Sequence, residues 1–474
     1  MTAGRRARVH RPPGASLSAL YLLASLLLAL PRLSAAEVDL ERLGSEAVER
    51  LQAYLRIDTT NPPGNETRAV EFLARILEAE GIPFETAESA PGRGNLWARL
   101  EGGDQPALVL LHHSDVVPAD ASRWPVPPFS GEIVDGHIYG RGALDMKSTG
   151  ILQLQTFLAL HRAGRPLDRD VLFVATADEE AGGAYGAGWL VEKHPELFAD
   201  AGLLLNEGGS GFVIGDRTVF GIEVTQKVPF WLRLEATGIP GHGSAPRIDS
   251  AVTRLVRALD RIREHEFPAR AVPAVEAFFR NMAPTAGEQL QPYYENLATA
   301  VEDPIFLRRL QIESPGFHAL LRNTCSITRL EGSSKINVIP PTAAAEIDCR
   351  ILPDQDPAAF RETLATVIND PAIELEEILL FSPAVSPTDT PLYRAIVAVT
   401  KRHFPDAVVT PAVSTGFTDS HFFRDVGIAS YGFAPIVLDE GERATVHGNS
   451  ERISVENVRR GTRLMLEIVQ EVVY

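Results

Sequence analysis

Cysteine is nearly absent from this sequence, whose 474 residues include only Cys325 and Cys349. Two cysteines cannot form a disulfide-rich scaffold or a cysteine zinc site. They occur in two predicted strands that flank a hairpin near residue 337, where they could lie opposite each other. We favour two buried free thiols over a disulfide, although an oxidising compartment would permit the bond.

Long apolar runs are also absent after the first 36 residues. The N-terminus has four arginines, then an apolar run over residues 17–30, then the small residues Ser34-Ala35-Ala36. The run is shorter than the ~20 residues of a membrane span, and the pattern is typical of a secretory signal peptide. An uncleaved anchor is the alternative. We expect an exported protein, periplasmic or secreted, with no stable membrane span after cleavage of residues 1–36.

Basic residues are scarce relative to acidic ones, with 45 Lys and Arg against 62 Asp and Glu and a formal charge of −17. The first 36 residues hold five arginines and no acid, so the remainder carries −22. Such a chain repels nucleic acid and anionic lipid. We therefore expect no nucleic-acid partner.

The first part of the chain alternates helical patterns with short apolar runs. The helical stretches cover residues 40–57, 68–80 and 151–162, and the apolar runs cover 107–111, 171–177 and 201–205. Runs that are apolar throughout are typical of strands buried on both faces. Their alternation with helices predicts an α/β fold with a mostly parallel central sheet covered by helices.

The pattern changes after residue 225. Strands are predicted at 230–236, 324–330, 343–351 and 373–380, and helices at 250–265 and 357–368. This order is that of a ferredoxin-like α+β domain. We predict a catalytic domain over 37–225 and 383–474, and an inserted lid domain over 226–382. Residues 270–318 fit neither pattern and are predicted to be a helical or irregular insertion.

Four groups of polar residues follow predicted apolar segments. They are His113-Ser114-Asp115, residues 140–147 with Asp145, Asp178-Glu179-Glu180, and residues 206–209 with Glu207. In open α/β sheets, ligands bind beyond the carboxyl ends of the strands. We therefore expect these side chains to meet in one crevice.

Imidazole and carboxylate together form the ligand set of hydrolytic zinc. Taken singly, His113 has a simpler interpretation as a core histidine, and Asp145 as a helix N-cap. Glu179 and Glu180 could begin a solvated helix, and Glu207 could belong to a turn. Their joint occurrence at strand ends favours a metal site, in which one of the paired glutamates binds metal and the other moves a proton.

From about residue 44 to its end, the chain resembles the zinc-dependent aminoacylase, carboxypeptidase and succinyl-diaminopimelate desuccinylase family. The segments that carry the resemblance are residues 113–118, 140–147, 179–180, 241–246, 337–340, 348–350, 416–420 and 447–448. Residues 124–139 and the insertion are similar to the carboxypeptidase S branch, which includes secreted N-acyl amino acid hydrolases. The resemblance implies a zinc-dependent metallopeptidase or amidohydrolase.

The resemblance also implies a metal centre with two Zn²⁺ per chain. Asp145 would bridge both ions, His113 and Glu207 would complete one site, and the other would be completed by Glu180 and His447. Cobalt or manganese would suit the same ligands.

Further roles follow from the same resemblance. Glu179 would be general base and then general acid, and Asp115 would orient His113. His242 would stabilise the oxyanion, and in dimeric members it comes from the neighbouring subunit's lid, so a homodimer through the lid domain is an expected partner. The residues expected to hold substrate are Asn337, Arg350, Gly416, Thr418, Asp419 and Ser420.

The expected reaction is hydrolysis of an amide bond adjacent to a free carboxylate, in a small peptide or an N-acyl amino acid. Two alternatives remain open. An exported two-lobed protein could be a periplasmic solute-binding protein, and a related zinc site could belong to a co-catalytic aminopeptidase. The sequence predicts no side-chain or acyl preference.

Overall fold

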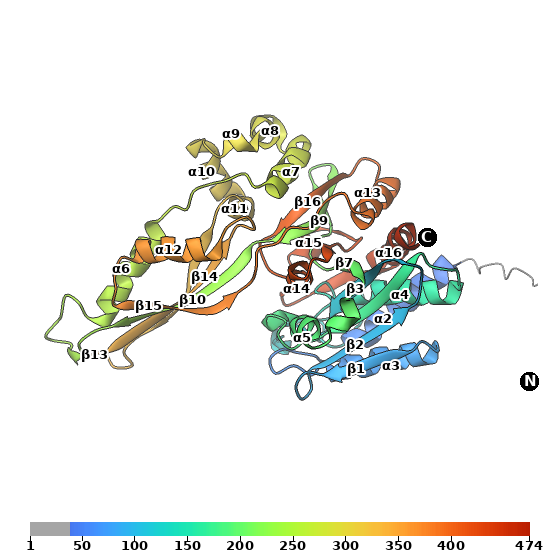
Figure 1. The fold of residues 1–474 in the computed structure, drawn as a ribbon, viewed down its shortest axis with the longest axis horizontal. Helices are drawn as coiled ribbons and strands as arrows, with labels where there is room; N and C mark the ends of the chain where they lie inside the picture. The colour runs from blue at the N-terminus through green and yellow to red at the C-terminus, as the bar shows by residue number, and fades with distance from the viewer. Residues whose placement is uncertain (1–37) are drawn as a thin grey trace, which may run out of the picture. The chain divides into compact units, whose positions relative to one another are not determined.

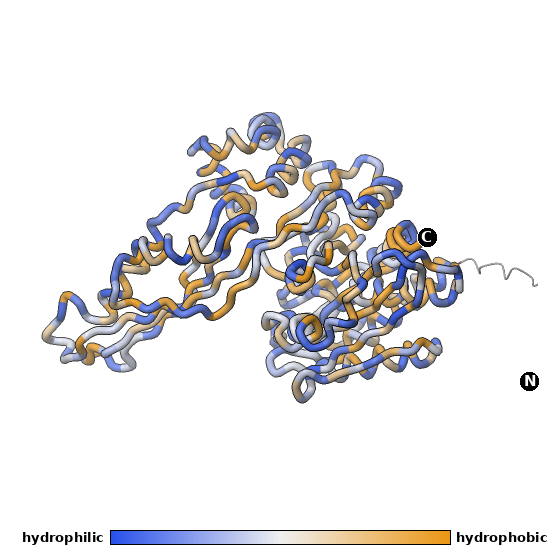
Figure 2. The backbone as a smooth tube through the Cα atoms, viewed as in Figure 1, coloured by the Kyte–Doolittle hydropathy of each residue, from blue (hydrophilic) through white to orange (hydrophobic). Residues whose placement is uncertain are grey.

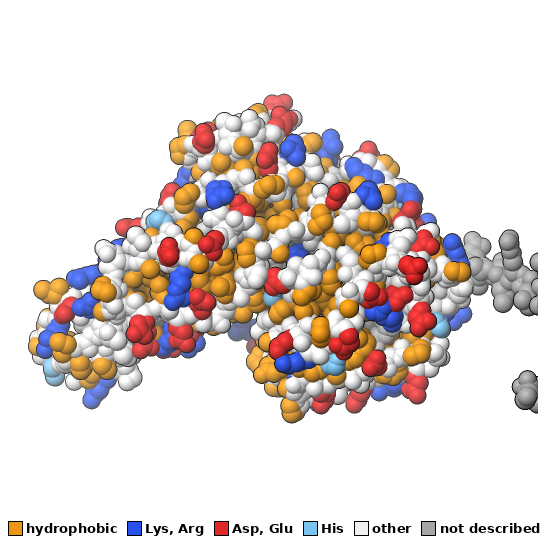
Figure 3. All heavy atoms as spheres, in the orientation of Figure 1, with side chains coloured by type: hydrophobic (Ala, Val, Ile, Leu, Met, Phe, Trp, Pro, Cys, Tyr) orange, Lys and Arg blue, Asp and Glu red, His pale blue; other side chains and the backbone are white. Residues whose placement is uncertain are grey.

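A computed structural model describes residues 38–474 (Figure 1). The predicted signal peptide at residues 1–36 lies outside this range. Within residues 38–474, no helix is both long and apolar enough to cross a membrane. On the face in view, acidic and basic side chains are interspersed (Figure 3), so that face presents no patch of a single charge.

The larger domain is built on one mixed sheet, with strand order β1-β2-β6-β3-β7-β17-β9-β8-β18 and β16 paired to β9. The strands are β1 (Phe84–Glu88), β2 (Gly94–Leu100), β3 (Gln105–His113), β6 (Arg169–Thr176), β7 (Ala201–Asn206), β8 (Gly211–Ile214), β9 (Arg217–Gln226), β16 (Val408–Ser414), β17 (Ala429–Gly432) and β18 (Val437–Leu438). Strands β6, β3, β7 and β17 run parallel. Their carboxyl ends therefore lie at one edge of the sheet, as predicted for an α/β fold.

Helices cover both faces of this sheet, whose central strands are hydrophobic along their length (Figure 2). Leu108 and Leu110 of β3 pack with one set of helices, whereas Val109 and Leu111 face the other set. The first set is α2 (Leu40–Leu55), α3 (Thr67–Ala79), α4 (Lys147–Ala163), α13 (Pro391–His403) and α16 (Val455–Val473). The second set is α5 (Ala187–Lys193) and α14 (Ser420–Asp425).

A small sheet joins two distant loops of the larger domain. Its order is β19-β5-β4, with β4 (Ile133–Val134), β5 (His137–Tyr139) and β19 (Arg452–Ser454). The pairing continues beyond the strands, because the Gly140 N–H donates to the Glu451 carbonyl at 3.0 Å. The short helix α15 (Glu440–Arg443) precedes this C-terminal segment. Residues 140–147 and 447–451 are thereby brought together.

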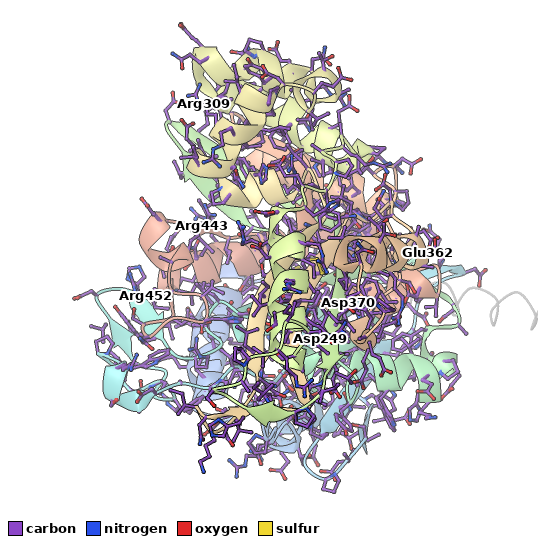
Figure 4. All side chains as sticks on the ribbon, turned by 90° about the vertical axis from the view of Figure 1, so that its left-hand side faces the viewer. Asp249, Arg309, Glu362, Asp370, Arg443 and Arg452 are labelled. Atoms are coloured by element: carbon purple, nitrogen blue, oxygen red, sulfur yellow. A yellow bond between two sulfur atoms is a disulfide. The ribbon has the colours of Figure 1, made fainter. Side chains whose placement is uncertain are left out.

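The smaller domain has the predicted ferredoxin-like order, with a sheet β12-β14-β10-β15 and two helices. Its elements are β10 (Val228–Thr237), α6 (Ala251–Glu264), β12 (Thr324–Glu331), β14 (Thr342–Ile351), α12 (Pro357–Ile368) and β15 (Ile373–Leu380). Alternate residues of β10 face the helices, including Phe230, Leu232 and Leu234. Arg254 of α6 also pairs with Asp370 at 2.9 Å, beside Asp249 (Figure 4). A separate pair of strands, β11 (Gly241–His242) and β13 (Val338–Ile339), lies at one end of this domain (Figure 1).

The segment between α6 and β12 is helical and has its own core. It contains α7 (Pro273–Met282), α8 (Gly287–Glu295), α9 (Leu297–Ala300), α10 (Pro304–Glu313) and α11 (Pro315–Ala319). This core includes Val219 of β9 and Val413 of β16, so the insertion packs against the sheet of the larger domain. The insertion therefore provides a further contact between the two domains. This contact is separate from the two places where the chain crosses between them, at residues 226–228 and after residue 380.

The expectation of two free thiols is wrong. Cys325 and Cys349 form a disulfide with their Cα atoms 4.0 Å apart. They are directly opposite each other in the antiparallel pair β12–β14. The sequence indicated the two strands, but a shift of one residue in their register would have turned the thiols to opposite faces.

Candidate active site

The expected metal ligands are brought together at the carboxyl edge of the large sheet. His113 is the last residue of β3, Glu207 follows β7, and Glu180 follows β6. Asp145 precedes α4 and His447 lies between α15 and β19. The three parallel strands place their following residues side by side, and the β5–β19 pairing brings in the other two segments.

Asp145 lies between two histidines, with one carboxylate oxygen toward each. Its Oδ1 is 3.1 Å from Nε2 of His113, and its Oδ2 is 3.0 Å from Nε2 of His447. Nε2 of His113 is also 3.5 Å from Glu207, and Nε2 of His447 is 3.4 Å from Glu180. The ligand atoms thus form a first group, His113-Asp145-Glu207, and a second group, Asp145-Glu180-His447, each with its atoms within 4.8 Å of one another.

The charges of this cluster fit divalent cations. Burial and then the Asp145 carboxylate raise the pKa of Glu207 to about 8. Burial opposes the charged form of His113, but its carboxylate neighbours, Glu207 foremost, hold its pKa well above the ordinary value. Hydrogen bonds to Asp145 and Glu180 raise the pKa of His447 to about 10. Clustered carboxylates beside imidazole nitrogens are a ligand set for hydrolytic zinc, so the residues present fit two cations that share Asp145.

Asp115 organises the backbone around this cluster. Its carboxylate accepts hydrogen bonds from the backbone N–H groups of Glu179 and Glu180, both at 3.1 Å. His113 Nδ1 is 3.0 Å from the Asp115 carbonyl oxygen and 3.4 Å from its carboxylate. An N–H at Nδ1 would leave Nε2 free to bind metal, as in many metal sites. Asp115 therefore contacts both a ligand and the glutamate pair.

Glu179 lies in the same cavity as the ligands. It begins a short 3₁₀ turn after Asp178, whose backbone is left-handed with φ 72°. Its side chain is buried, and burial followed by the nearby Glu207 raises its pKa well above the ordinary value. A carboxyl group with a raised pKa is suited to take up a proton and release it again.

The cavity has a volume of about 590 Å³ and is lined by both domains. The smaller domain contributes Trp231 and Arg350, and the loop after β16 contributes residues 416–418. Nε and Nη2 of Arg350 bind Asp348 at 2.7 and 3.1 Å, and Asp348 also accepts from the Trp231 indole at 2.8 Å. Among residues 38–474, Nη1 of Arg350 has no hydrogen-bond partner although it is buried. The cavity lining therefore includes a guanidinium with one nitrogen that has no acceptor.

The remaining residues expected to bind substrate lie elsewhere. Asp419 accepts a hydrogen bond from Thr176 at 3.0 Å, and Ser420 accepts one from Asn206 at 3.1 Å. Both are buried beneath the cavity rather than in its lining. Burial raises the pKa of Asp419 to about 7.

His242 and Asn337 are exposed and do not line this cavity. Arg350 pairs with Pro229 at the start of β10, whereas Thr342 pairs with Thr237 at its end. The eight-residue interval corresponds to about 26 Å along a strand. His242 and Asn337 belong to β11 and to the loop before β13, which lie beyond that far end of β10. They are therefore at the opposite end of the smaller domain from Arg350 (Figure 1).

Several contributing residues were not predicted from the sequence. Asn61 donates to Asp115 at 2.8 Å and to Asp178 at 3.2 Å, and Arg93 forms an ion pair with Asp178. The sequence Asn-Pro-Pro-Gly at 61–64 indicated only a loop. Trp231 could have been suspected as an aromatic on the exposed side of an alternating strand.

The comparisons agree with this geometry. The model of peptidase family M20/M25/M40 matches residues 109–471. The chain is 31% identical over 460 residues to the N-fatty-acyl-amino acid synthase/hydrolase of Xenopus tropicalis, covering 91% of this chain and 86% of that protein. It is 28% identical over 436 residues to human aminoacylase-1, covering 89% and 94%.

The fold is similar to that of an M20 family metallo-carboxypeptidase from Sulfolobus solfataricus. The TM-score is 0.69 at 20% identity, and the match covers 90% of this chain and 98% of the other. The predicted α/β fold with an inserted smaller domain is thereby confirmed, and so is the predicted family. The chain belongs to peptidase family M20/M25/M40 and is a metal-dependent hydrolase.

Proposed function

We propose that this protein is an exported di-zinc hydrolase that cleaves the amide bond of an N-acyl amino acid or a small peptide, next to a free carboxylate. One observation carries the proposal. The carboxylate that the two ligand groups share borders the same cavity as Glu179 and the unpaired nitrogen of Arg350. Export is supported by the pattern of residues 1–36.

The catalytic roles follow from position. Two bound cations would supply Lewis-acid activation of water and of the scissile carbonyl. Glu179 accepts the proton of the attacking water and later returns it to the departing nitrogen, a role supported by its place in the cavity lining beside the metal ligands. Asp115 holds the Glu179 backbone in place by accepting its N–H.

The substrate is held at both ends. Arg350 binds its carboxylate, with the guanidinium kept in orientation by Asp348. The larger domain also contributes apolar side chains to the lining, namely Val117, Leu144, Ala434, Ile436, Leu438 and Val446. An apolar lining suits an acyl chain or an apolar side chain, and a relative acts, according to its name, on N-fatty-acyl amino acids. We infer an N-acyl amino acid with an apolar acyl group.

His242 does not line the cavity of its own chain, so we propose that it reaches the active site of a second copy. The smaller domain offers an exposed apolar surface for this copy. Its strand β12 is an edge strand, and Ile327 and Leu330 of β12 are exposed beside Val252 and Val256 of α6. Unpaired edge strands with apolar side chains pair readily with another chain, and a two-fold dimer uses the same patch twice. We propose a homodimer through the lid domain.

A substrate panel tests the reaction. Zinc-loaded protein is assayed with N-acyl amino acids, their carboxamides and dipeptides. We expect turnover of the N-blocked acids, and loss of about 10²–10⁴-fold in kcat for Glu179→Gln with metal content unchanged. A requirement for a free amine would instead indicate an aminopeptidase, and near-normal activity of Glu179→Gln would remove the assigned base.

Complementation tests the dimer. His242→Ala and Glu179→Gln are each expected to be inactive, because each dimer then lacks one group at both sites. In a mixed dimer, one site combines Glu179 of one copy with His242 of the other, so mixing the two variants should restore part of the activity. Failure to regain activity after dissociation and reassociation of the mixture contradicts the shared site.

A further inference from the structure

A buried carboxylate, Glu451, fills the inside of the loop that carries Asp145. Its Oε2 accepts from Arg141 Nη1 at 2.7 Å and from the Gly142 N–H at 3.0 Å. Its Oε1 accepts from the N–H groups of Leu144 at 2.7 Å and Asp145 at 3.1 Å. Glu451 is 0% exposed. Four donors from residues 141–145 thus converge on one side chain, which fixes the backbone of the shared ligand.

Arg141, which binds Glu451, also binds the segment that carries His447. Its Nη2 donates to the carbonyl oxygens of His447 at 3.3 Å and Gly448 at 3.0 Å. The guanidinium carbon lies 5.2 Å from the centre of the Trp124 ring and the residue is 2% exposed. His447 has a left-handed backbone, with φ 56°, which a non-glycine residue keeps only where its surroundings hold it. The Arg141 fork supplies a contact that holds it.

The two ligand groups differ in how much they depend on this contact. His113 is the last residue of β3, a central strand, and its side chain is fully buried; Glu207 directly follows β7. His447 sits on a loop, and its side chain is 49% exposed. In the first group, His113 and Glu207 are therefore positioned by the sheet and only the shared Asp145 lies on the loop. In the second group, both Asp145 and His447 lie on loops, so this group needs residues 140–147 and 447–451 to be held together.

We propose that the Arg141–Glu451 ion pair is a positioning device for the second metal site. It sets Asp145 and His447 at the separation that Asp145-Glu180-His447 requires, without touching substrate. This inference rests on the proposed two-metal function. Its consequence is selective: loss of Glu451 weakens binding of the second cation far more than binding of the first.

A matched control in the same segment distinguishes a positioning role at the second metal site from a general structural role. Glu442 is also a buried carboxylate, 3% exposed, and accepts from the N–H groups of Asp439 at 3.1 Å and Ser454 at 2.9 Å. It caps α15, and within residues 38–474 none of its hydrogen bonds reaches residues 140–147. Glu442→Gln therefore removes a buried charge of the same kind while leaving the Asp145 loop in place.

The experiment titrates metal-free protein with Co²⁺ and follows the visible absorption of the bound ion and the heat of binding. We expect two binding steps for the wild type and for Glu442→Gln. In Glu451→Gln the second step should weaken by about 10–100-fold, the range seen when groups that orient ligands are removed, and the first step, which shares only Asp145 with the second, should weaken much less. Added Co²⁺ should then restore kcat without changing KM.

Arg141→Lys provides a second variant that retains the charge but loses the fork, so it should also weaken the second step. The inference is overturned if Glu451→Gln binds both ions as the wild type does, if both steps weaken equally, or if Glu442→Gln behaves like Glu451→Gln. A wild type that binds fewer than two ions would instead contradict the proposed function, so the two failures are distinguishable.

Discussion

Replacement of Arg350 by alanine is the sharpest test of how substrate is recognised. The guanidinium lines the cavity, its Nε and Nη2 are occupied by Asp348, and Nη1 is buried without a partner among residues 38–474. A substrate carboxylate would meet this group in a site shielded from water. The variant removes that contact and leaves the ligand cluster intact.

The magnitude follows from the surroundings of the guanidinium. Two opposite charges about 4 Å apart attract by about 4 kcal/mol at an effective dielectric constant of 20. Asp348 already neutralises part of this charge, so the value for one hydrogen bond to a charged group, about 1.5–3 kcal/mol, applies. At about 1.4 kcal/mol per tenfold change, kcat/KM for an N-acyl amino acid should fall by about 10–150-fold.

The assay compares an N-acyl amino acid with its carboxamide. Arg350→Ala should lose most of its preference for the acid while its activity toward the amide changes little. Arg233→Ala is the matched control, since Arg233 is a lid arginine that pairs with Glu331 at 2.9 Å and does not line the cavity. Equal losses for acid and amide would refute the carboxylate contact.

Three further predictions concern stability. Burial lowers the pKa of Lys227 to about 7 from 10.5. Between these pH values the unfolded state binds more protons, so the free energy of unfolding rises with pH, by at most about 1.4 kcal/mol per pH unit. Lys227→Met should flatten this rise when unfolding is followed by chemical denaturation, and parallel curves for the variant and the wild type would contradict it. Replacing Cys325 and Cys349 by alanine opens a loop with a sequence separation of 24 and should cost about 3 kcal/mol of unfolding free energy, which an unchanged denaturation midpoint would exclude. Removing metal with a chelator should lower Tm, because zinc at about 100-fold above its Kd stabilises the native state by about 2.7 kcal/mol; a Tm that does not recover when zinc is restored argues against binding to the folded protein.

The sequence predicted those features that depend on local pattern. Apolar runs located the buried strands, and alternation located the strands of the smaller domain, because burial imposes these periods on neighbouring residues. Polar residues that follow parallel strands meet at one edge of a sheet, and on this basis the sequence predicted that His113, Glu180 and Glu207 lie in one crevice. The same reasoning also placed residues 140–147 with Asp145 in that crevice, although in the structure this segment follows β5 of the small sheet rather than a parallel strand. His447 was assigned from the resemblance.

Features that depend on long-range register were not predictable in the same way. The opposition of Cys325 and Cys349 required the exact pairing of β12 with β14. Arg141 and Glu451 are 310 residues apart, and no spacing in the sequence relates them. His242 lay in a recognisable motif, but its distance from the metal ligands follows only from the length of β10 and the pairing of β14.

The central claim is that Asp145 is shared by two cations. Anomalous diffraction from crystals of the zinc-loaded protein tests it most directly. The account predicts two peaks about 3.5–4 Å apart, one on each side of Asp145, the first beside His113 and the second beside His447. A single peak, or peaks that do not share Asp145, would contradict the account.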